Sequence, residues 1–302
     1  MSQWPTTQAD LEHTLIAAEL RCGRCGYNLR GLSPLGACPE CGHDIWSSVV
    51  RTVDPAASRL PRLSNPKAVA WALLWIMCCA TVAALLLAFG AGRDSLNISG
   101  TGAGVLSISS ETLAFIASIV IVAALPGVLT LAPPRKKEQS NAIWVRLWLL
   151  AIGLVMWAAS SYWWSTMIYP PRPLTAEMVL RFAMTMSWVI ALLGLDGILK
   201  AIGQRSRAYR TAHGGRQSAR AMIAAAFAVA LGTFLQGLAR LDVLPARLEG
   251  YGTIIVWTSA LMLLIGVVYM LINTLWIFHS LRKPPPPLNS ILLKVEDRGR
   301  AR

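Results

Sequence analysis

Six long apolar runs constrain this chain more than any other feature of its sequence. They cover residues 68–89, 112–131, 143–168, 178–199, 221–239 and 253–280. A helix needs about 20 apolar residues to cross the hydrocarbon core of a bilayer, so each run is long enough for one crossing. The composition agrees, because 55% of the 302 residues are hydrophobic and only 14% are charged. We therefore expect an all-α membrane protein, with a six-transmembrane-helix bundle over residues 67–282.

The lysine and arginine residues predict the orientation of these helices. With the N-terminus in the cytoplasm, 23 of the 28 Lys and Arg residues fall in cytoplasmic segments and the other five in outer ones. Every cytoplasmic segment then carries more of them than any outer loop, as the positive-inside rule requires. The sequence thus predicts a multi-pass protein of the inner (cytoplasmic) membrane with both chain ends in the cytoplasm. The same distribution accounts for the net charge of +13, so the expected partner is the lipid bilayer, with nucleic acid not favoured.

A few residues interrupt the apolar runs. Pro126 lies inside the second run, where its missing N–H would kink a helix. Asp196 lies one turn from the cytoplasmic end of the fourth run, and Lys200 follows it at the i+4 spacing of a helical ion pair. Gln236 and Asn273 are suited to hydrogen bonds between helices. The alternative interpretation is that these four polar side chains form one intramembrane polar site. They would then line the path of a transporter or channel for a small solute or ion.

Four of the six cysteines form the pattern C-x2-C-x12-C-x2-C near the N-terminus. They are Cys22, Cys25, Cys38 and Cys41, in the segments "CGRCGY" and "CPECGH". Two residues between cysteines let one tight turn offer both sulfurs to a single ion, and zinc accepts four thiolates in a tetrahedron. A glycine follows each second cysteine, where it permits the positive φ that points backbone amides at sulfur.

This pattern predicts a zinc ribbon with one structural Zn²⁺ on four cysteines. A disulfide pair is disfavoured because the segment is expected to face the reducing cytoplasm. A thioredoxin-like dithiol would need one C-x-x-C in a βαβ context, which the sequence lacks. Iron in a rubredoxin-like site is the remaining alternative, since four sulfurs in a tetrahedron suit iron as well. All four positions are cysteine, so no coordination site is left open for catalysis.

The rest of the chain divides around these two features. Residues 1–20 predict a short amphipathic helix, and residues 21–45 the zinc ribbon with short β-hairpins. Residues 46–66 predict a linker, and residues 283–302 a basic, Pro-rich cytoplasmic tail containing "PPPP".

The stretch "CGYNLRGL" followed by "CPECG", and then by a multi-span segment, resembles a group of uncharacterised bacterial multi-pass membrane proteins that carry an N-terminal zinc ribbon. The resemblance covers residues 21–45. It implies a zinc ribbon attached to a membrane protein, and it implies no substrate or reaction. We expect a non-enzymatic membrane protein whose ribbon is a cytoplasmic protein-interaction or regulatory module.

Overall fold

The computed structural model describes residues 11–54, 60, 63, 65–98, 108–132, 141–166, 174–211, 219–283, 286 and 288–294 of the chain. The chain divides into two compact units. The bundle is Asn65–Arg282, and the head combines Met1–Ser64 with Lys283–Arg302. The head therefore draws on both ends of the chain, which the sequence pattern did not predict.

Six helices in the described part of the chain are long and apolar enough to cross a membrane, which confirms the predicted number. They are α4 (Pro66–Ile98), α5 (Ser110–Val122) continued by α6 (Leu125–Thr130), α7 (Asn141–Thr166), α8 (Leu174–Gly203), α10 (Arg220–Arg240) and α11 (Arg247–Arg282). A short helix, α9 (Arg207–Thr211), lies between α8 and α10 in the sequence.

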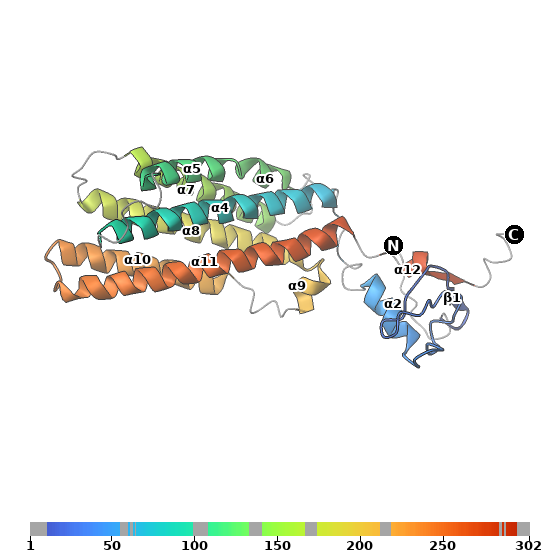
Figure 1. Cartoon of the computed structure of the whole chain (residues 1–302). Coiled ribbons are helices and arrows are strands. Elements are labelled where there is room, and N and C mark those ends of the chain that lie inside the picture. The colour runs from blue at the N-terminus through green and yellow to red at the C-terminus, as the bar shows by residue number, and fades with distance from the viewer. Residues whose placement is uncertain are drawn as a thin grey trace. The chain divides into compact units, whose positions relative to one another are not determined.

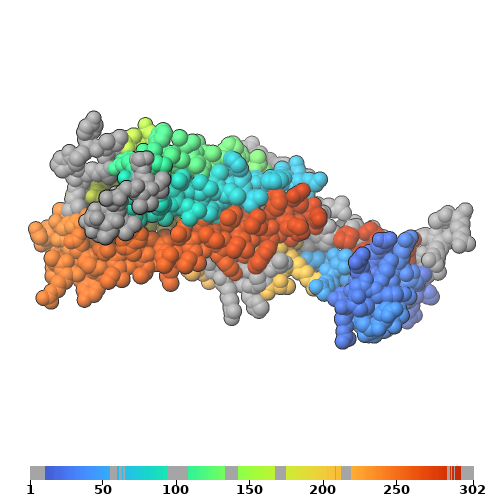
Figure 2. Space-filling view, viewed as in Figure 1, coloured from blue at the N-terminus to red at the C-terminus, as the bar shows by residue number. Residues whose placement is uncertain are grey.

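The six membrane-length helices pack as a closed ring. Each one contacts the next along the chain, and α11 returns to contact α4. Figure 1 shows the helices running side by side, and Figure 2 shows α4 and α11 adjacent on one face. Close packing depends on glycine: a Cβ on Gly194 of α8 would lie 2.5 Å from the backbone nitrogen of Leu150 in α7. Small residues allow this approach between membrane helices, where packing drives association.

The second span is broken where the sequence predicted a kink. Helix α5 ends at Val122 and α6 begins at Leu125, with Pro126 in its first turn. The indole N–H of Trp75 in α4 donates a hydrogen bond of 2.7 Å to the carbonyl oxygen of Ala123, inside the break. A carbonyl released from the helical pattern thus finds a partner on the neighbouring helix, as the interior of a membrane requires.

The outward faces of the bundle are strongly apolar. On α11, Leu261, Met262 and Ile265 are 58%, 67% and 61% exposed. Contiguous apolar surface of this kind is rare on soluble monomers and normal against lipid. The exposed side chains therefore support the assignment to a membrane that helix length alone suggested.

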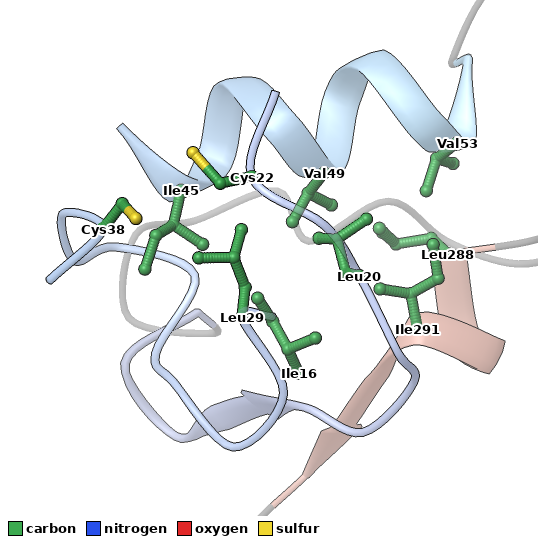
Figure 3. Close-up of a cluster of buried hydrophobic side chains, with 10 residues drawn as sticks. All are labelled: Ile16, Leu20, Cys22, Leu29, Cys38, Ile45, Val49, Val53, Leu288 and Ile291. Atoms are coloured by element: carbon green, nitrogen blue, oxygen red, sulfur yellow. The ribbon is translucent and has the colours of Figure 1, made fainter. Parts of the chain in front are cut away.

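The head is small and is built around one hydrophobic cluster. It contains β1 (Thr14–Ile16), α2 (Ile45–Val53), α12 (Leu288–Ile291) and β2 (Leu292–Lys294). Strands β1 and β2 form a two-stranded antiparallel sheet in which Leu15 pairs with Leu293. Figure 3 shows the cluster, to which both ends of the chain contribute. Its buried members are Ile16, Leu20, Cys22, Leu29, Cys38, Ile45, Val49, Val53, Leu288 and Ile291.

Three sequence predictions about the head need correction. The amphipathic helix predicted over residues 1–20 is wrong at Thr14–Ile16, which form β1, while residues 1–10 lie outside the described part of the chain. The predicted linker at 46–66 begins instead with helix α2. The predicted tail at 283–302 includes residues 288–294, which pack into the head. The β-hairpins predicted in the ribbon are not clearly shown, because its described residues contain two isolated antiparallel bridges, Arg21 with Asn28 and Ala37 with Asp44.

Candidate metal centre

The four cysteines lie on two tight turns with the same backbone geometry. In the first turn the N–H of Gly26 donates to the carbonyl oxygen of Cys22 at 3.0 Å, and in the second Gly42 donates to Cys38 at 2.8 Å. Both glycines have positive φ, +78° at Gly26 and +68° at Gly42. This confirms the positive φ predicted at both glycines, a conformation that an L-residue with a side chain rarely adopts.

The similarity of the two turns extends to the residues around them. Two further backbone bonds near the first turn recur 16 residues later near the second, all with N···O distances between 2.7 and 3.1 Å. Near the first turn, the backbone N–H of Cys22 donates to the carbonyl oxygen of Tyr27, and that of Leu29 donates to Leu20. Near the second turn, Cys38 donates in the same way to His43, and Ile45 donates to Gly36. The head thus contains an internal structural repeat that the sequence analysis did not identify.

The repeat brings the four sulfurs together. All four Sγ atoms lie within 4.8 Å of one another. The Cys22 and Cys41 sulfurs are 3.6 Å apart, and so are those of Cys25 and Cys38. In a zinc tetrahedron with Zn–S bonds of about 2.3 Å, neighbouring sulfurs are about 3.8 Å apart. The spacing therefore fits one tetrahedral ion, and no disulfide links these cysteines.

Burial differs between the two cysteines of each turn. Cys22 and Cys38, the first of each pair, are buried in the hydrophobic cluster, while Cys25 is exposed and Cys41 is intermediate. An ion held here would have the apolar cluster on one side and the turns on the other. Four thiolates complete a tetrahedron, so the site can hold an ion and organise the fold but leaves no position for a reacting water or substrate.

Backbone groups in the first turn influence the ionisation of its thiols. Hydrogen bonds from the backbone N–H groups of Cys25 and Arg24 lower the pKa of the Cys22 thiol to about 6, because amide donors stabilise a thiolate. The backbone N–H of Tyr27 also lowers the pKa of Cys25. The side-chain hydrogen bond of Cys25 to Cys41, its burial, and its side-chain hydrogen bonds to Cys38 and Cys22 outweigh that effect. Together they raise the pKa of Cys25 to about 12. Four adjacent thiolates repel one another, and a cation removes that repulsion.

Helix α2 holds the first turn in place. Its N-cap, Asp44, accepts hydrogen bonds from the backbone N–H groups of Trp46 and Ser47 at 3.3 and 2.9 Å. One turn further on, the Ser48 hydroxyl accepts from the N–H of Gly23 at 3.1 Å. The Arg51 guanidinium donates to the carbonyl oxygen of Gly23 at 3.4 Å. Helix α2 therefore contacts both polar backbone groups of the residue that follows Cys22.

The predicted intramembrane polar residues do not form one site. Asp196 and Lys200 make the expected ion pair at 2.6 Å, and Asp196 also accepts from the backbone N–H of Ala219, which caps α10. Gln236 instead donates to Thr253 at 2.9 Å. It lies 17 residues beyond Ala219 along α10, about 26 Å at the rise of an α-helix. Asn273 is buried on α11.

A partly open apolar cavity of about 240 Å³ lies between α4, α8, α10 and α11. Alanine and leucine side chains make up much of its lining, which also includes Thr185 and Trp188. The Thr185 hydroxyl already donates to the carbonyl oxygen of Arg181. Within the described residues, this cavity offers no set of groups for acid, base or nucleophilic chemistry.

Several residues that build the metal centre were missed in the sequence. Asp44 before Ile45, Val49 and Val53 is an N-cap followed by apolar residues at i+4 spacing, which is a recognisable helix signal. Leu288 and Ile291 carried no such signal, because a three-residue spacing in a short tail is common.

Comparison of the chain with protein-family models, with curated proteins and with solved structures gives no match.

Proposed function

We propose that this protein is an integral membrane protein without catalytic activity, whose head binds one structural Zn²⁺ and serves as a cytoplasmic protein-interaction or regulatory module. The observation that carries the proposal is the group of four Sγ atoms within 4.8 Å on two matching turns. A closed four-thiolate site stabilises a fold and performs no reaction, so the head acts through its surface.

The charge distribution supports a cytoplasmic head. The segments that would face the cytoplasm carry 23 of the 28 Lys and Arg residues, in agreement with the positive-inside rule. A reducing cytoplasm also keeps thiols available to a metal. In a bacterial cell this orientation corresponds to the inner membrane.

The chemistry of the site favours zinc, with iron as the alternative. Metal analysis of protein purified from its native membrane, together with its visible spectrum, separates the two. Zinc at one equivalent in a colourless protein is the expected result. A coloured protein that contains iron and shows the charge-transfer absorption of iron–thiolate bonds would identify the ion as iron rather than zinc. The Cys38→Ser/Cys41→Ser variant should lose the metal in either case.

The surface around the turns supports an interaction role. Arg24 and Arg30 are exposed there, and Tyr27 and Leu35 are 40% and 39% exposed. Exposed cations together with exposed aromatic and aliphatic side chains suit an acidic protein surface. Nucleic acid is the narrower alternative, and its binding would weaken steeply with salt.

The test is a crosslinking pull-down from native membranes, with bound zinc measured in each sample. Wild type is compared with Cys38→Ser/Cys41→Ser and with Cys78→Ala, a matched cysteine variant in α4 that lies outside the head. We expect partners to disappear together with zinc in the double variant and to remain in Cys78→Ala. An unchanged set of partners on a correctly inserted, zinc-free protein would show that the head is not the docking module.

A further inference from the structure

The C-terminal segment 288–294 lies within the head as part of its fold. Strand β2 pairs with β1, and the backbone N–H of Ala17 donates to the carbonyl oxygen of Ile291 at 2.8 Å. On its other side β1 bonds to the chain near the first turn: Ile16 donates to Leu32 at 3.0 Å, and Gly31 donates to Ile16 at 2.7 Å. Strand β1 thus lies between the C-terminal segment and the ribbon.

The segment and the metal ligands also share one core. Leu288 and Ile291 are 6% and 2% exposed, and they belong to the same buried cluster as Cys22 and Cys38. Figure 3 shows Leu288 and Ile291 beside Leu20 and Val53. A cluster this small does not bury enough apolar surface to be stable by itself. Its stability therefore depends on the metal and on the segment together.

The bundle keeps the two connections to the head close together. Trp71, in the first turns of α4, packs edge-on against Phe278, in the last turns of α11, with ring centroids 4.8 Å apart. The Arg282 guanidinium lies over both rings, 6.0 Å from Trp71 and 5.5 Å from Phe278. The chain therefore leaves the bundle for both parts of the head from neighbouring points, and only five residues separate Arg282 from Leu288. Such a short link gives the segment a high effective concentration.

From these contacts we infer that metal binding at the four cysteines and docking of segment 288–294 stabilise each other. Together they link the chain before α4 to the chain after α11, and we call this arrangement the clasp. The inference rests on the proposed metal site. Linkage makes the coupling reciprocal, so the factor by which docking raises metal affinity equals the factor by which metal strengthens docking. Loss of the metal is then a signal that releases the C-terminal segment.

The first experiment measures metal affinity on the full-length protein in detergent, by competition with a zinc chelator. Truncation after Pro287 removes the segment, and truncation after Lys294 is the matched control that keeps it. We expect the first truncation to lower zinc affinity by about 10-fold or more and the second to leave it unchanged. A point-variant pair repeats the comparison: Ile291→Ala removes a buried side chain, whereas Leu293→Ala removes one that is 45% exposed.

The second experiment observes the segment itself. Hydrogen–deuterium exchange of the full-length protein should show peptides covering 288–294 protected with zinc bound and exchanging rapidly after chelation, while peptides from α7 and α8 do not change. Equal zinc affinity in both truncations, or a segment whose protection ignores chelation, would overturn the clasp. If Cys38→Ser/Cys41→Ser also kept its zinc, the metal site itself would be wrong, so the two failures are distinguishable.

Discussion

At the scale of single residues, each metal-binding turn depends on one glycine with a positive φ. Gly26 and Gly42 have open space where a Cβ would be, so a side chain there would be opposed by backbone conformation alone. Gly26→Ala should lower the stability of the metal-bound head by about 1–2 kcal/mol, or roughly 10-fold in zinc affinity. Chelator competition measures the effect.

Two further variants make this prediction specific. Gly23→Ala, in the same turn, adds a methyl group 3.5 Å from Arg51, an ordinary contact, at a residue without positive φ. It should change zinc affinity little. Gly26→Asn should recover part of the loss, since asparagine adopts positive φ more readily than alanine. Equal losses for Gly23→Ala and Gly26→Ala would contradict the conformational argument.

Asp196 leads to a different prediction, because its carboxylate has two partners of different kinds. Its bond to Lys200 is a half-exposed i,i+4 ion pair, and such pairs contribute about 0.3–0.5 kcal/mol. Its bond to the N–H of Ala219 caps α10. Asp196→Asn keeps an acceptor and should change the thermal midpoint in detergent little, whereas Asp196→Ala should lower stability by about 1 kcal/mol. Equal effects would show that the cap is not the important contact.

At the scale of elements, α7 and α8 approach through glycine. A Cβ on Gly194 would lie 2.5 Å from the nitrogen of Leu150 and 2.6 Å from the carbonyl oxygen of Arg146, both backbone atoms that cannot rotate away. Gly194→Ala should therefore force the helices apart and destabilise the bundle by about 1–3 kcal/mol. Gly250→Ala, near the start of α11, meets nothing within 4 Å and should be neutral or slightly stabilising. Thermal unfolding in detergent compares the two variants.

Elements whose formation depends on local sequence were predictable. The six spans follow from apolar length, and the break in the second span follows from Pro126, because a proline removes a helical hydrogen bond wherever it occurs. The metal centre was equally local: two residues between paired cysteines and a glycine after each pair define a turn. Neither inference needed to know which segments meet in the fold.

Elements whose formation depends on distant partners were not predictable. Leu11 and Leu15 share a helical face, which favoured a helix, yet residues 14–16 form a strand because β2 lies beside them. That partner is almost at the other end of the chain, and no local pattern indicates it. The buried positions of Leu288 and Ile291 have the same origin. Helix α2 is different, since its cap and apolar spacing were present in the sequence and were overlooked.

At the scale of the whole molecule, one observation requires an even number of crossings. Segments from before the first span and after the last span, β1 and β2, pair in one head. Any crossing count that placed the ends on opposite sides of a membrane would break the β1–β2 sheet. Six spans satisfy this condition, and the charge distribution predicts that the shared side is the cytoplasm.

Cysteine labelling tests this topology. A membrane-impermeant maleimide added to intact cells should label Val243→Cys, a 65% exposed position between α10 and α11. It should label Leu293→Cys, in β2, only after the membrane is permeabilised. Wild type, with its native cysteines, gives the background. Labelling of Leu293→Cys in intact cells would place the head outside and reverse the orientation.

The composition of the head also sets when it can be completed during synthesis. Its ribbon and α2 emerge from the ribosome first, whereas Leu288 and Ile291 are translated after all six spans. At about 5–20 residues per second, this interval lasts roughly 10–50 s. A chain that stops early, or is cut before residue 288, lacks part of the head core however well its cysteines are placed. A finished head therefore requires that synthesis has passed all six spans and reached segment 288–294.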